Sequence, residues 1–277
     1  MLTLALHRHE LRRTILSLRR ATPVAEAPPV TTAGPSAGCL APAAAPDNEL
    51  FSLPDGRRFV VYLPRARGTG PAPLVVGLHG WGDDALHFAD WFPLHDHVAP
   101  EAFVVYPDAE GRWDVRAEGD VVFVARVVAA VAARHCIDTS RLYAFGFSWG
   151  GRLASNLACA GRTPFRAVAL GDASYHGRTG PCAPTDVFVT VRTHDQDERP
   201  ESGRDAADRW AATNRCEAKA TPLAGAPTCA EHRSCATGKR VVLCEDAFFD
   251  PSWPKEWNHT VRTPYVELAA RFFAGKL

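Results

Sequence analysis

A single serine in the middle of the chain has the surroundings of an activated nucleophile. Ser148 is the central residue of the pattern Gly146-x-Ser148-x-Gly150, between a short apolar run at 142–145 and a helix-like segment at 152–158. This is the sequence form of a nucleophile elbow, in which a buried strand turns sharply into a helix and exposes one serine hydroxyl. A turn this tight brings backbone against backbone, which explains the glycines. The alternative is a Gly-rich strand-to-helix turn with an idle serine.

A serine nucleophile needs a histidine base and an acid that orients it, and two later loops contain candidates. His259 is the only histidine after His232, and it lies in a loop ahead of the last predicted helix. Asp195 is the first carboxylate after the predicted strand 187–192, and Asp197 is the runner-up. The carboxylate would hold the histidine tautomer and stabilise the imidazolium. The alternatives are a solvated histidine and a solvated acidic loop.

Such a site also needs two backbone N–H groups that bind the oxyanion formed in the reaction. One donor is the residue that follows the nucleophile, here Trp149, and the other comes from a loop after an earlier strand. The predicted strand 74–78 leads into His79-Gly-Trp81-Gly-Asp, which predicts Trp81 as the second donor. Because the donors must be held rigidly, glycines are expected in this loop. A generic Gly-rich turn is the alternative.

The predicted elements alternate from about residue 50 onward. Apolar runs bounded by Pro and Gly predict strands at 58–63, 74–78, 103–106, 142–145, 167–170 and 187–192. Helices are predicted at 85–99, 121–134, 152–160, 203–213 and 264–274, with a Cys-rich excursion at 214–244. This alternation predicts an α/β fold with a mostly parallel, twisted sheet and helices on both faces. Active sites of such sheets lie beyond the carboxyl ends of the strands.

The order of the three candidates along the chain agrees with this fold. Ser148 comes first, Asp195 second and His259 last. This is the order found in α/β-hydrolases and differs from the orders of the other two large serine-hydrolase designs. We therefore expect a triad of the α/β-hydrolase type.

Several blocks of the sequence resemble one family of α/β-hydrolases. They include Leu78-His-Gly-Trp-Gly, Phe103-Val-Val-Tyr-Pro107, Cys136-Ile-Asp-Thr-Ser-Arg-Leu-Tyr143 and Gly146-x-Ser148-x-Gly-Gly151. This ordered set, over roughly residues 50–275, is similar to polyhydroxybutyrate depolymerases and to feruloyl and acetylxylan esterases. The resemblance implies a secreted α/β-hydrolase and carries the triad roles onto Ser148, Asp195 and His259.

The chain departs from this family in two loops. Glu198-Arg199 stands where the family's acid loop usually continues with Val-Pro, and Trp253-Pro254 comes before His259 rather than after it. The acid and the geometry of its loop are therefore the less secure part of the resemblance.

These observations predict a serine carboxylic-ester hydrolase that works through an acyl-enzyme. Its substrate would be a polyester, feruloyl or acetyl ester, polymeric or small, and no metal or organic cofactor is needed. One alternative is a peptidase or amidase on the same fold. The other is a catalytically silent protein that binds carbohydrate or polymer.

Tryptophans are concentrated in or beside the predicted loops. Five of the seven are there, namely Trp81, Trp113, Trp149, Trp253 and Trp257. Aromatic faces around an ester site suit a hydroxycinnamoyl ring, a sugar or a flat polymer surface. We expect His79, Trp113, Trp253 and Trp257 to contact the substrate; the alternative is that the tryptophans pack the loops.

Composition and charge are those of one enzyme-sized domain. The chain has 277 residues, 46% of them hydrophobic, with 31 basic and 31 acidic side chains. A net charge of zero gives no basic surface for nucleic acid or anionic membrane. No segment reaches the roughly 18 apolar residues of a membrane span. Residues 49–277 are expected to form the catalytic domain.

Eight cysteines suggest disulfides and hence an oxidising compartment, secreted or periplasmic. Connectivities number on the order of 100. We favour Cys229–Cys235 and Cys216–Cys244 as nested local bridges; Cys159–Cys182 and Cys39–Cys136 then follow by elimination. Buried free thiols are the alternative.

The first 48 residues are expected to form an N-terminal extension, disordered or processed. Residues 1–21 contain no unbroken apolar run of the 7–15 residues typical of a signal peptide. Residues 22–48 are rich in Ala, Pro and Thr, which suits a flexible tether.

Overall fold

The protein is built on one twisted sheet that crosses the whole domain. The computed structural model describes residues 20–42, 47–66, 68–109, 111–176, 181–253 and 255–277. In this part of the chain the sheet has 11 strands in the order β1-β2-β3-β5-β4-β6-β7-β8-β11-β10-β9. The strands are β1 (Thr22–Pro23), β2 (Glu49–Ser52), β3 (Arg58–Tyr62), β4 (Ala72–Leu78), β5 (Phe103–Pro107), β6 (Ile137–Phe147), β7 (Ala167–Gly171), β8 (Asp186–Arg192), β9 (Ala220–Leu223), β10 (Ala226–His232) and β11 (Val241–Asp246).

The middle of this sheet is parallel and is flanked on both sides by antiparallel pairs, while the outermost pair β1–β2 is parallel again. Neighbouring strands from β5 through β4, β6, β7 and β8 to β11 all run in the same direction. The pairs β2–β3, β3–β5, β9–β10 and β10–β11 are antiparallel. Every residue of β5 and β7 is buried, as continuous apolar strands covered on both faces require. The predicted α/β class with a mostly parallel sheet is confirmed.

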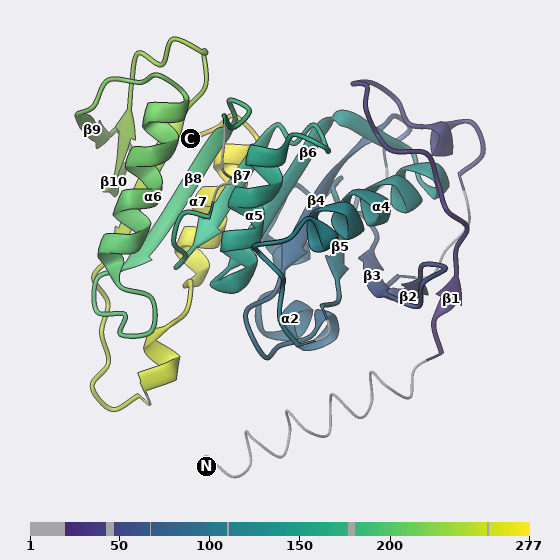
Figure 1. Cartoon of the computed structure of the whole chain (residues 1–277), viewed down its shortest axis with the longest axis horizontal. Helices are drawn as coiled ribbons and strands as arrows, with labels where there is room; N and C mark the ends of the chain where they lie inside the picture. The colour runs from purple at the N-terminus through teal and green to yellow at the C-terminus, as the bar shows by residue number, and fades with distance from the viewer. Residues whose placement is uncertain (1–19, 43–46, 67, 110, 177–180, 254) are drawn as a thin grey trace.

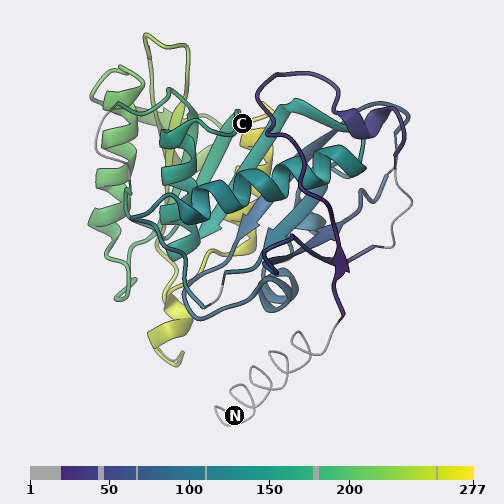
Figure 2. The same ribbon diagram turned by 45° about the vertical axis from the view of Figure 1, so that its right-hand side comes forward.

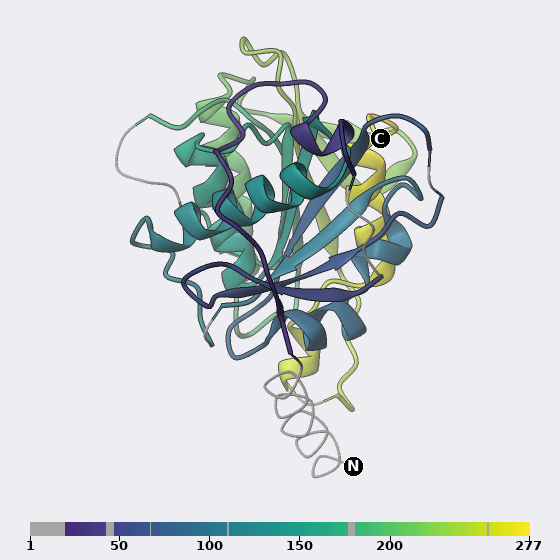
Figure 3. The same ribbon diagram turned by 90° about the vertical axis from the view of Figure 1, so that its right-hand side faces the viewer.

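Helices cover both faces of the sheet (Figures 1 and 3). One face packs against α4 (Gly119–Arg134), α5 (Trp149–Ala160) and α6 (Pro200–Thr213). The other packs against α2 (Ala85–Trp91), α3 (Leu94–His97) and α7 (Thr263–Phe273). Short 3-10 helices lie at Ala37–Cys39 (η1) and Lys255–Asn258 (η2). No helix among the described residues is both long enough and apolar enough to cross a bilayer.

Two predictions of local structure are wrong. The predicted helix 85–99 is divided into α2 and α3, because Pro93 lies between them and has no N–H to continue the helical hydrogen bonds. The predicted Cys-rich excursion at 214–244 contains β9, β10 and the start of β11, and β11 pairs in parallel with β8. Its short, mixed polar and apolar segments carry little periodicity, so the sequence did not reveal these strands.

The N-terminal segment packs on the domain instead of forming a flexible tether. Over the described residues 20–42, β1 pairs with β2 and the side chain of Val24 is buried. Gly38 lies so close to the backbone of His135 that a Cβ there would come within 2.4 Å of the His135 carbonyl oxygen. In Figure 2 this purple segment crosses in front of α4. The rest of the predicted extension, 1–19 and 43–46, lies outside the described residues.

Four disulfides join the eight cysteines in the structure, and two of the four predicted pairs are correct. Cys39–Cys136 and Cys159–Cys182 form as predicted. The other bridges are Cys216–Cys235 and Cys229–Cys244, which corrects the two nested pairs favoured from the sequence. The physical reason is the missed hairpin, because Cys229 and Cys244 lie directly opposite each other on β10 and β11.

We predict that Cys39→Ala/Cys136→Ala lowers the free energy of unfolding by roughly 2–4 kcal/mol. This bridge closes a sequence separation of 97 residues and anchors the N-terminal segment. Urea unfolding without reductant, with limited proteolysis of residues 20–42, measures both effects. In the matched variant Cys216→Ala/Cys235→Ala the N-terminal segment should stay resistant to protease. Equal proteolysis in the parent and in the Cys39/Cys136 variant would contradict the packed segment.

Candidate active site

Ser148 lies at the sharp turn between β6 and α5, at the carboxyl edge of the sheet. Its backbone has φ 53° and ψ −117°, a conformation that L-residues rarely adopt. A Cβ at Gly146 would lie 2.1 Å from the carbonyl oxygen of Gly150, and a Cβ at Gly150 would lie 2.1 Å from that of Leu78. Only glycines therefore fit on either side of the serine, as its sequence pattern predicts.

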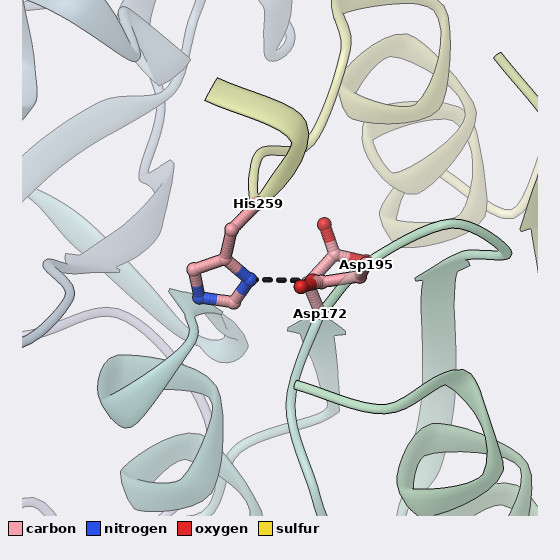
Figure 4. A group of neighbouring side chains, drawn as sticks. All are labelled: Asp172, Asp195 and His259. Atoms are coloured by element: carbon pink, nitrogen blue, oxygen red, sulfur yellow. Dashed lines mark hydrogen bonds and ion pairs between the residues drawn. The ribbon is translucent and has the colours of Figure 1, made fainter. Parts of the chain in front are cut away.

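The structure brings Ser148, His259 and Asp195 into one chain of hydrogen bonds. His259 Nε2 lies 2.8 Å from Ser148 Oγ, and His259 Nδ1 lies 2.5 Å from Asp195 Oδ2 (Figure 4). A carboxylate can only accept, so Nδ1 carries the proton and Nε2 is free to accept the serine proton. This is the arrangement in which histidine can act as a general base toward a serine hydroxyl.

Asp195 rather than Asp197 contacts the histidine. The other carboxylate oxygen of Asp195 accepts hydrogen bonds from the backbone N–H groups of Asp197, at 2.8 Å, and Glu198, at 3.0 Å. The residue is 5% exposed, which excludes a solvated acidic loop. The ambiguity between the two aspartates is thereby resolved in favour of Asp195.

An ion pair that the sequence did not reveal ties the loop after β8, which carries Asp195, to α5. Glu198 is 7% exposed, and its carboxylate pairs with the guanidinium of Arg152. Arg152 stands one helical turn after Ser148 and donates its backbone N–H to the Ser148 carbonyl oxygen. Glu198 is one of the two residues at which the chain departs from the family's Val-Pro. The departure was visible in the sequence, but its partner was not.

The two predicted oxyanion donors, Trp149 and Trp81, belong to segments that lie next to Ser148. Trp149 is the first residue of α5, so its N–H has no acceptor within the helix. The loop with Trp81 packs against the nucleophile, since a Cβ at Gly80 would lie 3.6 Å from Ser148 Cβ. The ring of Trp81 meets that of Trp149 edge-on, with centroids 5.9 Å apart.

Similar proteins are found by sequence and by structure, although no family model matches the sequence. A probable feruloyl esterase C of Aspergillus clavatus is 31% identical over 42% of this chain and 46% of its own length. Feruloyl esterase D of Neurospora crassa is 28% identical over 78% of this chain and 82% of its own. The alignment thus spans about half the length of the first relative.

Among solved structures, acetyl xylan esterase from Aspergillus awamori matches with a TM-score of 0.58 at 12% identity, covering 70% of this chain and 89% of that one. A carboxylesterase of Bacillus cereus matches with a TM-score of 0.51 at 17% identity, covering 80% and 95%. The chain has the α/β-hydrolase fold. The predicted resemblance to feruloyl and acetylxylan esterases is confirmed, whereas the resemblance to depolymerases stays a prediction.

His79 and Trp113, two of the residues predicted to contact substrate, are buried and hold loops together. Both are fully buried, at 0% exposure. His79 Nδ1 donates to the Gly80 carbonyl oxygen and Nε2 accepts the N–H of Ala109, while Trp113 Nε1 donates to the His79 carbonyl oxygen. Their prediction as substrate-binding residues is therefore wrong, and loop packing, the alternative for the tryptophans, is correct for Trp113.

Three of the other tryptophans, Trp81, Trp253 and Trp257, are at least partly accessible. Trp81 is 66% exposed and Trp257 is 50% exposed, with Trp253 half-buried between Trp257 and Phe248. The ring centroids of Trp253 and Trp257 are 6.2 Å apart, and those of Phe248 and Trp253 are 5.5 Å apart. The rings of Trp81 and Trp149 thus form one aromatic group near Ser148. Trp253 and Trp257 belong to a second group, in the segment that precedes His259.

Asp83 fixes the loop that contains Trp81 to α2. Its carboxylate accepts from His87 Nδ1 at 2.6 Å, from Trp91 Nε1 at 2.8 Å and from the N–H of Asp84 at 2.9 Å. Burial by itself raises the pKa of Asp83, but the hydrogen bonds from His87, Trp91 and Asp84 lower it below its ordinary value. The charged form of Asp83 therefore stabilises the folded state.

We predict that Asp83→Asn lowers the free energy of unfolding by about 2 kcal/mol at pH 7. Because the folded-state pKa is lowered, this stabilisation is complete above the ordinary value of 3.8 and is lost as the pH falls through the folded value. Urea unfolding at pH 7 and at pH 2 measures the change. Asp205→Asn, which breaks the exposed pair with Arg209, should cost less than about 0.5 kcal/mol. An undiminished Asp83 effect at pH 2 would contradict the explanation.

Proposed function

We propose that this α/β-hydrolase is a serine carboxylic-ester hydrolase that works through an acyl-enzyme. The observation that carries the proposal is the chain of hydrogen bonds from Ser148 Oγ through His259 to the buried Asp195. The relatives named as feruloyl esterases and the fold shared with solved esterases support the same reaction class.

In the first half of the reaction, Ser148 Oγ attacks the ester carbonyl carbon while His259 Nε2 takes the serine proton. Asp195 stabilises the imidazolium that forms. The N–H groups of Trp149 and Trp81 bind the oxyanion, each contributing about 3 kcal/mol to the transition state. His259 then returns the proton to the departing alcohol oxygen, which leaves Ser148 acylated.

In the second half, water takes the place of the alcohol. His259 removes a proton from the water as its oxygen attacks the acyl carbon, and the proton returns to Ser148 as the acid leaves. No step of this sequence calls on a metal or an organic cofactor.

The substrates we propose are feruloyl or acetyl esters, with polymeric esters included. Feruloyl esterases and an acetyl xylan esterase are among the proteins that this chain resembles. The exposed rings of Trp81 and Trp257 suit the flat face of a hydroxycinnamoyl group, a sugar or a polymer. The four disulfides support a secreted or periplasmic location for the enzyme.

The two alternatives weighed from the sequence find less support. A silent binding protein has no need of three hydrogen-bonded catalytic groups at one site. A peptidase or amidase is disfavoured because the similar proteins are named for ester hydrolysis.

Labelling with a fluorophosphonate probe tests whether Ser148 is activated. We expect the parent protein, with its disulfides intact, to be labelled, and Ser148→Ala and His259→Ala to lose labelling and at least about 10³-fold in kcat on p-nitrophenyl acetate. Trp257→Ala is a folded comparison in which labelling should persist. No labelling of well-folded parent protein would remove the hydrolase proposal and favour the binding protein.

The identity of the acid is tested by two isosteric variants. We expect Asp195→Asn to lower kcat by at least about 100-fold, because its carboxylate contacts His259 Nδ1. Asp197→Asn should lower kcat by less than about threefold, because Asp197 contacts Asp195 through its backbone N–H, which the substitution leaves in place. Kinetics on p-nitrophenyl acetate and methyl ferulate measure both, and the reverse order would reassign the acid.

A further inference from the structure

A second carboxyl group lies behind the proposed triad, at the end of the strand between those of Ser148 and Asp195. Asp172 follows β7 directly and is 2% exposed. One ligand-type atom from each of Asp172, Asp195 and His259 lies within 4.8 Å of the others. Figure 4 shows the carboxyl groups of Asp172 and Asp195 side by side, both on the Nδ1 side of the His259 ring.

The backbone of Asp172 is held in a strained conformation next to the serine. Its φ is 43°, in the left-handed region that non-glycine residues rarely adopt. Its N–H donates to the Thr190 carbonyl oxygen at 3.0 Å, and the carbonyl oxygen of the preceding Gly171 accepts the N–H of Ser148 at 2.8 Å. The surrounding strands thus fix a strained aspartate between the nucleophile and the acid loop.

The two carboxylate oxygens of Asp172 have different surroundings. Oδ1 accepts the N–H of Arg192 at 2.8 Å, whereas Oδ2 is buried and has no hydrogen-bond partner among the described residues. Burial raises the pKa of Asp172 well above its ordinary value, and the neighbouring Asp195 raises it further. The surroundings of Asp172 therefore favour its neutral form.

In the described part of the chain, the charged side chains around Asp172 leave one positive charge, that of Arg192, without a negative partner other than Asp172 and Asp195. Asp246, on β11, is held by two hydrogen bonds of 2.6 Å from Arg262, so these two charges cancel. Arg192, at the end of β8, is a buried cation with 1% exposure, and its guanidinium donates to neutral acceptors. Tyr265 lines a small cavity together with Asp172 and Arg192, and its hydroxyl donates to the backbone carbonyl of Glu245. A single negative charge shared by Asp172 and Asp195 would therefore neutralise the positive charge of Arg192.

We propose that Asp172 is a positioning residue that shares one negative charge with Asp195, so that a carboxylate remains beside His259 when Asp195 is neutralised. Two carboxyl groups this close do not both ionise, because like charges in a buried site repel. Neutralising Asp195 removes this repulsion and lets Asp172 carry the charge opposite Arg192. The inference rests on the proposed serine-hydrolase mechanism.

A double-mutant cycle tests this sharing. We measure kcat and KM on p-nitrophenyl acetate at pH 7.5 for the parent, Asp172→Asn, Asp195→Asn and the double variant. Asp195→Asn should cost about 100-fold in kcat and the double variant about 10⁴-fold, the usual cost of losing the triad acid altogether. Asp172→Asn in the parent should cost less than about tenfold. KM should change little, since neither carboxyl group touches substrate.

The outcome that overturns the proposal is additivity. If Asp172→Asn costs the same factor in the parent and in Asp195→Asn, Asp172 holds the fold and does not share charge with Asp195. A parent without Ser148-dependent esterase activity would instead overturn the proposed function, so the two failures are distinguishable.

Two further variants separate charge from packing. Thr190 lines the same cavity as Asp172, and its buried hydroxyl has no hydrogen-bond partner among the described residues. Thr190→Val removes this polar group without changing any charge. The kcat of Thr190→Val/Asp195→Asn should therefore equal that of Asp195→Asn. Asp172→Ser is a second neutral replacement, which must reproduce the coupling seen with asparagine. Urea unfolding of each variant shows that the comparison is between folded proteins.

Discussion

The active-site architecture depends on one close contact, the packing of backbone against backbone where β6 turns into α5. Gly146 touches Gly150, and Gly150 touches the carbonyl of Leu78 at the end of β4. This contact locks two neighbouring parallel strands and the nucleophile helix together. Because the turn cannot relax, Ser148 is held in its strained backbone conformation, with its hydroxyl within reach of His259.

Several charged side chains at the carboxyl edge of the sheet lie around the turn at Ser148. Arg152 on the nucleophile helix pairs with Glu198, whose backbone N–H holds Asp195. Under the triad, Arg192 is a buried cation, and we infer that it faces one shared negative charge. Asp195, Glu198 and Arg192 are buried and Arg152 is half-buried, so each of these charged groups needs its partner in a defined place.

Much of the fold and of the candidate site could be predicted where the signal is local. The apolar parallel strands, the Gly-x-Ser-x-Gly turn and the order of serine, acid and histidine follow from short stretches of sequence. The predictions that were wrong concern contacts between segments that are distant in the sequence. Neither β11 as an inner strand nor the Cys229–Cys244 bridge could be seen, because each depends on the pairing of distant segments. The ring of Trp113 was assigned to substrate but is packed under His79.

The sequence by itself determined the α/β class and the strained turn at Ser148, since glycine at 146 and 150 is a steric requirement of that turn. Only the tertiary structure showed that Asp195 and not Asp197 contacts His259, and that Asp172 lies near both. It also showed that Trp81 and Trp257 are exposed whereas His79 is buried. The physical reason is that a side chain's role at this edge depends on which strand ends beside it. Hydrogen bonds and packing across the sheet set that neighbourhood, and local sequence does not encode it.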